Sequence, residues 1–80
     1  MLYNQDLLNE LNVLARYHLE SLQEGIKVHK DAAPEIVSAT ARLFHKGLVD
    51  HEDGGYLTHL GVEVAEKVQS ILTILCTENN

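Results

Sequence analysis

The residues of this sequence that are best suited to hold a metal ion are five histidines and one cysteine: His18, His29, His45, His51, His59 and Cys76. None of them forms a Cys-x-x-Cys pair or the His-x-x-x-His spacing of a zinc site on a helix. The sequence also shows no pair of carboxylates at catalytic spacing, no nucleophile beside a base and no glycine-rich phosphate loop. It therefore predicts no metal site, no cofactor and no small-molecule substrate, and the protein is not expected to be an enzyme.

The types and positions of the basic residues fit phosphate binding better than metal binding or catalysis. The chain carries six Lys and Arg against twelve Asp and Glu, a net charge of −6 that disfavours nucleic acid overall. Four of the six basic residues nevertheless lie within residues 26–46, together with only two acids. The side chains predicted to contact DNA are Lys27, Lys30, Ser38, Arg42, His45 and Lys46. Arg42 would read a base edge, and the lysines would hold phosphates.

Each of these positions also has a purely structural interpretation. Arg42 could pair with Glu35 or Ser38 on its own helix, and His45 could simply face solvent near a helix end, because surface ion pairs and exposed polar side chains are common. A mixed surface on an acidic protein explains the clustering of basic residues equally well. Both interpretations stay open on the sequence alone.

The first and last helices have clear apolar periodicity. Leucines at three- and four-residue spacing predict a helix over residues 4–16, and Asn4 can cap its first turn. A long apolar stripe predicts a final helix over residues 59–76, which Thr58 can cap in the same way. Both helices need a partner surface for their apolar sides.

A helix in the middle of the chain would carry the predicted DNA contacts. Pro34 suits the first position of a helix over residues 34–46, and Gly47 suits its end, because glycine readily adopts the left-handed conformation. The residues predicted to form its buried stripe are Ile36, Ala39, Thr40, Leu43 and Phe44. The basic residues of this helix lie mostly outside that stripe.

Two further elements complete the chain. Apolar spacing and a Ser21–Glu24 capping box predict a helix over residues 20–29. Two short β-like runs around Asp53-Gly54-Gly55 predict a hairpin over residues 48–58, in which Leu57 packs inward. The predicted order is thus helix, helix, helix, hairpin, long helix. The fold class is mainly α with a small β-hairpin, in one domain over residues 1–80.

This order is that of a winged helix-turn-helix domain, and three segments resemble MarR-, ArsR- and PadR-like bacterial regulators. They are Ser21-Leu22-Gln23-Glu24 before the third helix, Arg42-Leu43-Phe44-His45-Lys46-Gly47-Leu48-Val49 at its exit, and Tyr56-Leu57-Thr58-His59-Leu60-Gly61 at the exit of the wing. The resemblance covers about residues 4–68. It implies that the helix over 34–46 enters the major groove. The whole chain is similar to a family of bacterial proteins of about this size described as DNA-binding proteins or transcriptional regulators.

The hairpin departs from that pattern, because Asp50, Glu52 and Asp53 stand where DNA-binding wings usually carry Arg or Lys. Phosphates would repel these acids, so the hairpin is predicted to point away from a duplex or to brace the fold. The alternative function is a winged-helix module that binds protein and not DNA. The acidic balance, the acidic hairpin and the apolar final helix favour this alternative.

The final helix is apolar on more than one side, which predicts a symmetric homodimer with this helix at its interface. The residues predicted to form the interface are Val62, Val68, Ile71, Leu72, Ile74 and Leu75. Cys76 is expected to be a small buried hydrophobic residue in the same apolar region.

The cellular location expected from the sequence is the cytoplasm. No apolar run approaches the ~20 residues that span a bilayer, and the first residues lack the basic flank and apolar stretch of a secretory signal. A single cysteine suits a reducing compartment.

Overall fold

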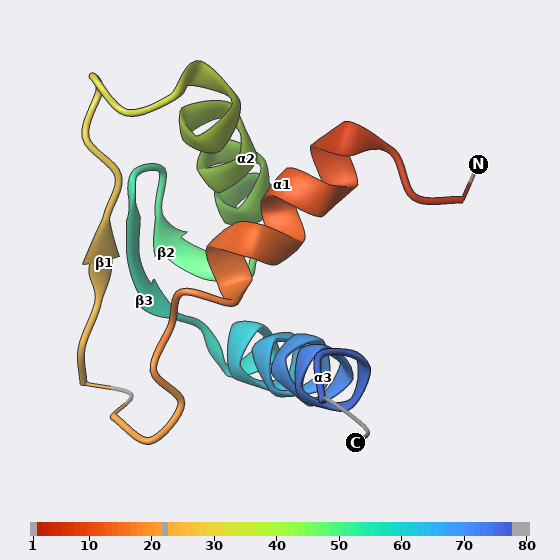
Figure 1. Ribbon diagram of the computed structural model, residues 1–80. Coiled ribbons are helices and arrows are strands. Elements are labelled where there is room, and N and C mark those ends of the chain that lie inside the picture. The colour runs from red at the N-terminus through yellow and green to blue at the C-terminus, as the bar shows by residue number, and fades with distance from the viewer. Residues whose placement is uncertain (1, 22, 78–80) are drawn as a thin grey trace.

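The computed structural model describes residues 2–21 and 23–77, which form three helices and a small sheet (Figure 1). The elements in chain order are α1 (Gln5–Leu14), β1 (Ile26–Lys27), α2 (Pro34–His45), β2 (Val49–His51), β3 (Gly54–Leu57) and α3 (His59–Leu75). The predicted fold class, mainly α with a small β-hairpin and a long C-terminal helix, is confirmed. The three helices and the hairpin end within two residues of the predicted positions.

Local side-chain chemistry explains where the helices begin and end. The Asn4 side chain accepts a hydrogen bond from the Leu7 backbone N–H at 2.8 Å, and Pro34 is the first residue of α2. The Thr58 hydroxyl accepts from the Gly61 N–H at 3.0 Å at the start of α3. Gly47 follows α2 with a φ of +81°, a conformation that favours glycine. These predicted ends are confirmed.

The segment predicted to be a helix over residues 20–29 contains the strand β1 instead, so that prediction is wrong. β1 pairs antiparallel with β3, with Ile26 opposite Gly55, and the sheet order is β1-β3-β2. A Cβ at Gly25 would lie 2.8 Å from the carbonyl oxygen of Gly55, so the two backbones approach too closely for a larger residue. Pairing with β3 thus overrides the apolar spacing that suits a helix. Leu22, which belonged to the predicted helix, lies outside the described residues.

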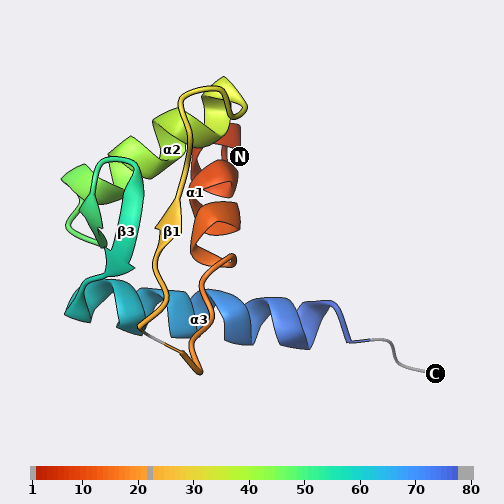
Figure 2. The ribbon, with the colours of Figure 1, turned by 90° about the vertical axis from the view of Figure 1, so that its left-hand side faces the viewer.

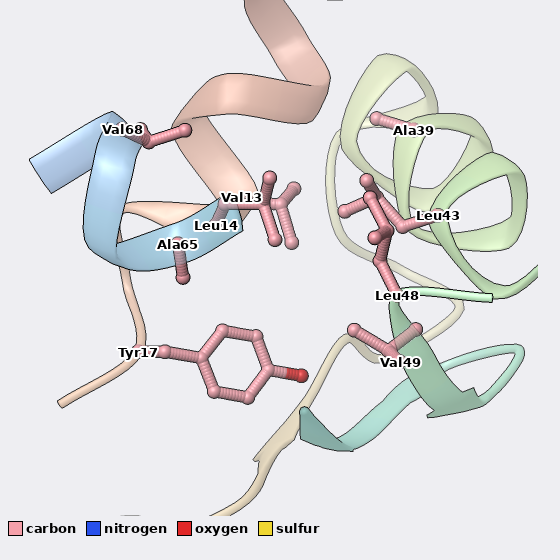
Figure 3. Close-up of a cluster of buried hydrophobic side chains, with 9 residues drawn as sticks. All are labelled: Val13, Leu14, Tyr17, Ala39, Leu43, Leu48, Val49, Ala65 and Val68. Carbon is pink, nitrogen blue, oxygen red and sulfur yellow. The ribbon is translucent and has the colours of Figure 1, made fainter. Parts of the chain in front are cut away.

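A cluster of buried side chains joins the helices to the sheet (Figure 3). It consists of Val13, Leu14, Tyr17, Ala39, Leu43, Leu48, Val49, Ala65 and Val68. The Tyr17 hydroxyl donates to the Gly55 carbonyl at 3.0 Å, and burial together with the negative charge of Asp50 raises the pKa of Tyr17 to about 12. Leu57 is half-buried and packs against this cluster, as predicted. Phe44 was predicted to be buried but is 37% exposed, because Leu43 takes the position that faces the core.

The start of α3 is fixed against the turn that connects α2 to β2. The Thr58 hydroxyl donates to the Gly47 carbonyl at 2.6 Å, and the Thr58 N–H donates to the Leu48 carbonyl at 3.0 Å. A Cβ at Gly61 would lie 1.9 Å from the Leu48 carbonyl oxygen. Only glycine at this position lets the helix approach the turn so closely.

From this junction α3 runs along one end of the molecule, and its C-terminal turns extend past α1 (Figure 2). Every residue from 71 to 77 is exposed. None of the helices within residues 2–21 and 23–77 has the length and apolar character needed to cross a membrane.

Candidate functional site

Arg42 of α2 and Lys46, the residue that follows this helix, were predicted to contact DNA but are bound to an acid of α1. Arg42 donates through Nε to Glu10 Oε2 at 2.8 Å, and Lys46 Nζ contacts Glu10 Oε1. Arg42 Nη2 also donates to the Asp6 carbonyl at 3.2 Å, with the Asp6 carboxylate 3.9 Å away. In an ordinary surface salt bridge both partners face water, and the pair contributes little to stability. Glu10 is only 5% exposed, so these ion pairs differ from surface salt bridges. The two cations therefore connect α1 to α2.

The charges in this Glu10 cluster balance one another. Burial by itself raises the pKa of Glu10, but the hydrogen bonds and positive charges of Lys46 and Arg42 outweigh that effect and lower it. Glu10 is therefore ionised at neutral pH. The structural interpretation of the sequence paired Arg42 with Glu35 or Ser38 on its own helix. In the structure Arg42 pairs with Glu10 of α1 instead. The cluster leaves little net positive charge on α2 for phosphate.

The Glu10 cluster predicts how stability depends on pH. Because the folded state holds the pKa of Glu10 below its usual 4.5, ionised Glu10 stabilises the fold above that value. This stabilisation is lost as the pH falls through the lower folded-state pKa. Urea unfolding between about pH 7 and about pH 3 should show wild-type protein losing more stability than Glu10→Gln, which cannot titrate. Parallel stability profiles for the two proteins would contradict this role of the Glu10 cluster.

The remaining residues predicted to contact DNA, namely Lys27, Lys30, Ser38 and His45, are exposed. Lys30 lines a small cleft of about 190 Å³ whose other walls are Val28, Val37, Ala41, Glu52 and Asp53. The Val28 N–H donates to the Asp53 carbonyl at 2.8 Å, which holds the hairpin tip against the end of β1. The acids of the tip thus lie beside the lysine and the middle of α2. The tip therefore contacts the end of β1 and the middle of α2, and whether it points away from a duplex or only braces the fold stays a prediction.

The other acid of the hairpin has a local structural role. Asp50 Oδ1 accepts from the Tyr56 N–H at 2.8 Å and lies 2.7 Å from His51 Nδ1. These two contacts lower the pKa of Asp50. A Cβ at Gly55 would lie 2.2 Å from the same carboxylate oxygen, so the turn needs glycine there. Among the described residues, no three His, Cys, Asp or Glu side chains gather into a set that could bind a metal ion.

A large apolar surface spans α1 and the C-terminal half of α3. Five big apolar side chains of α1 and the C-terminal half of α3 are between 40 and 76% exposed: Leu8, Ile71, Leu72, Ile74 and Leu75. A groove of about 270 Å³ runs between the two helices, lined by Gln5, Leu8, Leu11, Asn12, Val68, Ile71 and Leu72. We call the groove and the side chains of Ile74 and Leu75 beside it the α1–α3 face.

The α1–α3 face includes five of the six side chains predicted to form a dimer interface. Ile71, Leu72, Ile74 and Leu75 are exposed on it, and Val68 forms the floor of the groove. Val62 is half-buried and does not line the groove. Cys76 was expected to be buried but is exposed, because the end of α3 extends past α1.

Leu8 and Leu11 were not predicted as part of this surface. The available signal was the wide distribution of apolar residues around α1, more than one buried stripe requires.

Comparison with known proteins places the chain in a family. A family model matches residues 1–76, and its description is a family of unknown function, DUF5669. No curated protein and no solved structure matches the chain. No MarR-, ArsR- or PadR-like family is indicated, so the resemblance to those regulators stays a prediction. Because the match covers nearly the whole sequence, this chain belongs to the DUF5669 family.

Proposed function

We propose that this protein is an interaction module that acts by binding another protein surface through the α1–α3 face. The observation that carries the proposal is this face itself, a groove with exposed leucine and isoleucine side chains around it. Soluble domains rarely keep such a surface free of a partner, because contact with water costs free energy roughly in proportion to apolar area.

The electrostatics of the described residues support the same proposal. The chain has a net charge of −6, and both Lys and Arg side chains of residues 34–46, Arg42 and Lys46, are paired with Glu10. Glu52 and Asp53 lie beside Lys30, where a DNA phosphate would have to approach. The surface around α2 is therefore poorly suited to hold a polyanion.

DNA contact through α2 is a second proposal, and one observation favours it. Lys27, Lys30, Ser38 and His45 are exposed and available to a ligand. In this alternative a homodimer would present two α2 helices to a two-fold symmetric site.

A salt-dependent DNA titration distinguishes the two proposals. Anisotropy of a labelled duplex of mixed sequence should show no binding at micromolar protein, at about 50 mM or about 200 mM salt. Affinity that falls steeply with salt, and that weakens in the Lys27→Ala, Lys30→Ala double variant, would refute the interaction proposal in favour of DNA. The positive control is the Glu52→Lys, Asp53→Lys double variant, which lacks the acids beside Lys30. This variant should bind the duplex modestly, with an affinity that falls as salt rises.

A further inference from the structure

We infer that the partner of the α1–α3 face is a second copy of this chain, with the end of α3 from each protomer seated in the α1–α3 groove of the other. This inference rests on the proposed function and names the partner of the same surface. Three properties of the face carry it: its shape, its lack of charge and its size.

The shape of the face is self-complementary. The groove is lined on the α3 side by Val68, Ile71 and Leu72, and Leu75 projects one helical turn beyond it with 76% of its surface exposed. A two-fold axis relates the same patch on both protomers, so a patch that holds both a groove and a projecting side chain can pair with itself. An axis that crosses α3 near Ile71 and Leu72 turns the two helices antiparallel and places Leu75 opposite the partner's Val68.

The groove and the end of α3 lack ionisable side chains, and the nearest charges on α3 are those of Glu63, Glu66 and Lys67, which line a neighbouring depression with Ile71. Residues 68–77 contain no Asp, Glu, Lys, Arg or His, and the groove residues of α1, Gln5, Leu8, Leu11 and Asn12, are uncharged as well. Two copies with a charge of −6 each repel wherever their acids approach. Contact through the groove and residues 68–77 brings uncharged side chains together and leaves Glu63, Glu66 and Lys67 at the edge of the contact.

The area of the face suits a dimer of this size. Its five exposed apolar side chains present on the order of 500 Å² to solvent, against about 800 Å² per partner in a standard interface. Gln5 and Asn12, which also line the groove, add polar contact area beside these apolar side chains. Pairing would also cover the last turns of α3, where every residue from 71 to 77 is exposed in the single chain.

Sedimentation equilibrium of the full chain tests the inference. Wild-type protein at about 10 μM should sediment with twice the chain mass of 8.9 kDa. Ile71→Glu and Leu75→Glu should each weaken association about 100-fold, because each places a charge in an apolar contact. Both side chains are exposed, so circular dichroism of both variants should remain that of the folded chain. Leu60→Glu is the matched control, since Leu60 is 49% exposed on the same helix but lies far from the proposed axis.

A cross-linking experiment tests the position of the two-fold axis. In a Cys76→Ser background, Ile71→Cys should give a disulfide-linked dimer on mild oxidation, because both copies of residue 71 lie beside the axis. Leu60→Cys in the same background should remain monomeric on a non-reducing gel. The inference is overturned by a wild-type chain that stays monomeric up to about 100 μM, or by a dimer that both glutamate variants leave intact. A monomer that also fails to bind DNA would leave the proposed function standing with a different protein partner.

Discussion

Gly61→Ala is expected to lower the free energy of unfolding by about 3 kcal/mol or more, a large effect for one added methyl group. The new Cβ would lie 1.9 Å from the Leu48 carbonyl oxygen and 3.0 Å from its carbon. The carbonyl has little freedom to move, because it accepts the Thr58 N–H at 3.0 Å. In a helix interior without such a contact, the same change stabilises by up to ~1 kcal/mol, so the sign of the effect is informative.

Urea unfolding followed by circular dichroism measures this difference, and Gly47→Ala provides the matched control. Gly47 has a φ of +81° with no atom within 4 Å of an added Cβ. Its replacement should cost only the backbone strain, about 1 kcal/mol. A Gly61→Ala variant as stable as the wild type would show that α3 does not begin against the turn at Leu48.

The second large effect is expected from Arg42→Ala combined with Lys46→Ala, at about 3 kcal/mol of lost stability. Glu10 is 5% exposed, and both of these cations contact its carboxylate. Without them, the fold must either keep an unpaired buried charge or protonate Glu10. Each single substitution should cost less than half as much, because the remaining cation still pairs with the carboxylate.

A further substitution separates this explanation from simple loss of packing. Glu10→Leu in the double-variant background removes the buried charge and should recover part of the stability. Lys27→Ala with Lys30→Ala, which removes two exposed cations, should change stability by less than about 0.5 kcal/mol. If the Arg42, Lys46 double variant unfolds like the wild type, the Glu10 cluster contributes nothing to stability. The same variant would then become a suitable probe of DNA binding.

Much of the fold was predictable from local signals. Asn4, Pro34 and Thr58 identify the three helix starts by the hydrogen bonds or backbone angles that each residue favours. β1 was missed because Leu19 and Ile26 have a spacing that also suits a helix. A signal for the strand was present in the alternation of apolar Ile26, charged Lys27 and apolar Val28, which matches their burial in the structure.

The candidate sites depend on contacts between distant residues, and these were harder to predict. Arg42 and Glu10 are separated by 32 positions, and no local pattern indicates that they pair. The apolar periodicity of α3 is similar for residues that enter the core and for residues that a partner would cover. Ala65 is fully buried while Ile71 is 55% exposed, because Ala65 faces the core of α1, α2 and the sheet and Ile71 lies on another side of α3.

The junction around Thr58 has a mechanical consequence for the far end of the molecule. The carbonyls of Gly47 and Leu48 hold Thr58 at the start of α3, Gly61 packs against Leu48, and the helix is 17 residues long. A tilt of α3 by about 5° at this junction would displace the far end of the helix by about 2 Å, because the helix rises 1.5 Å per residue. A substitution at the junction can therefore misalign Leu75 with a partner while leaving every residue of the contact surface unchanged.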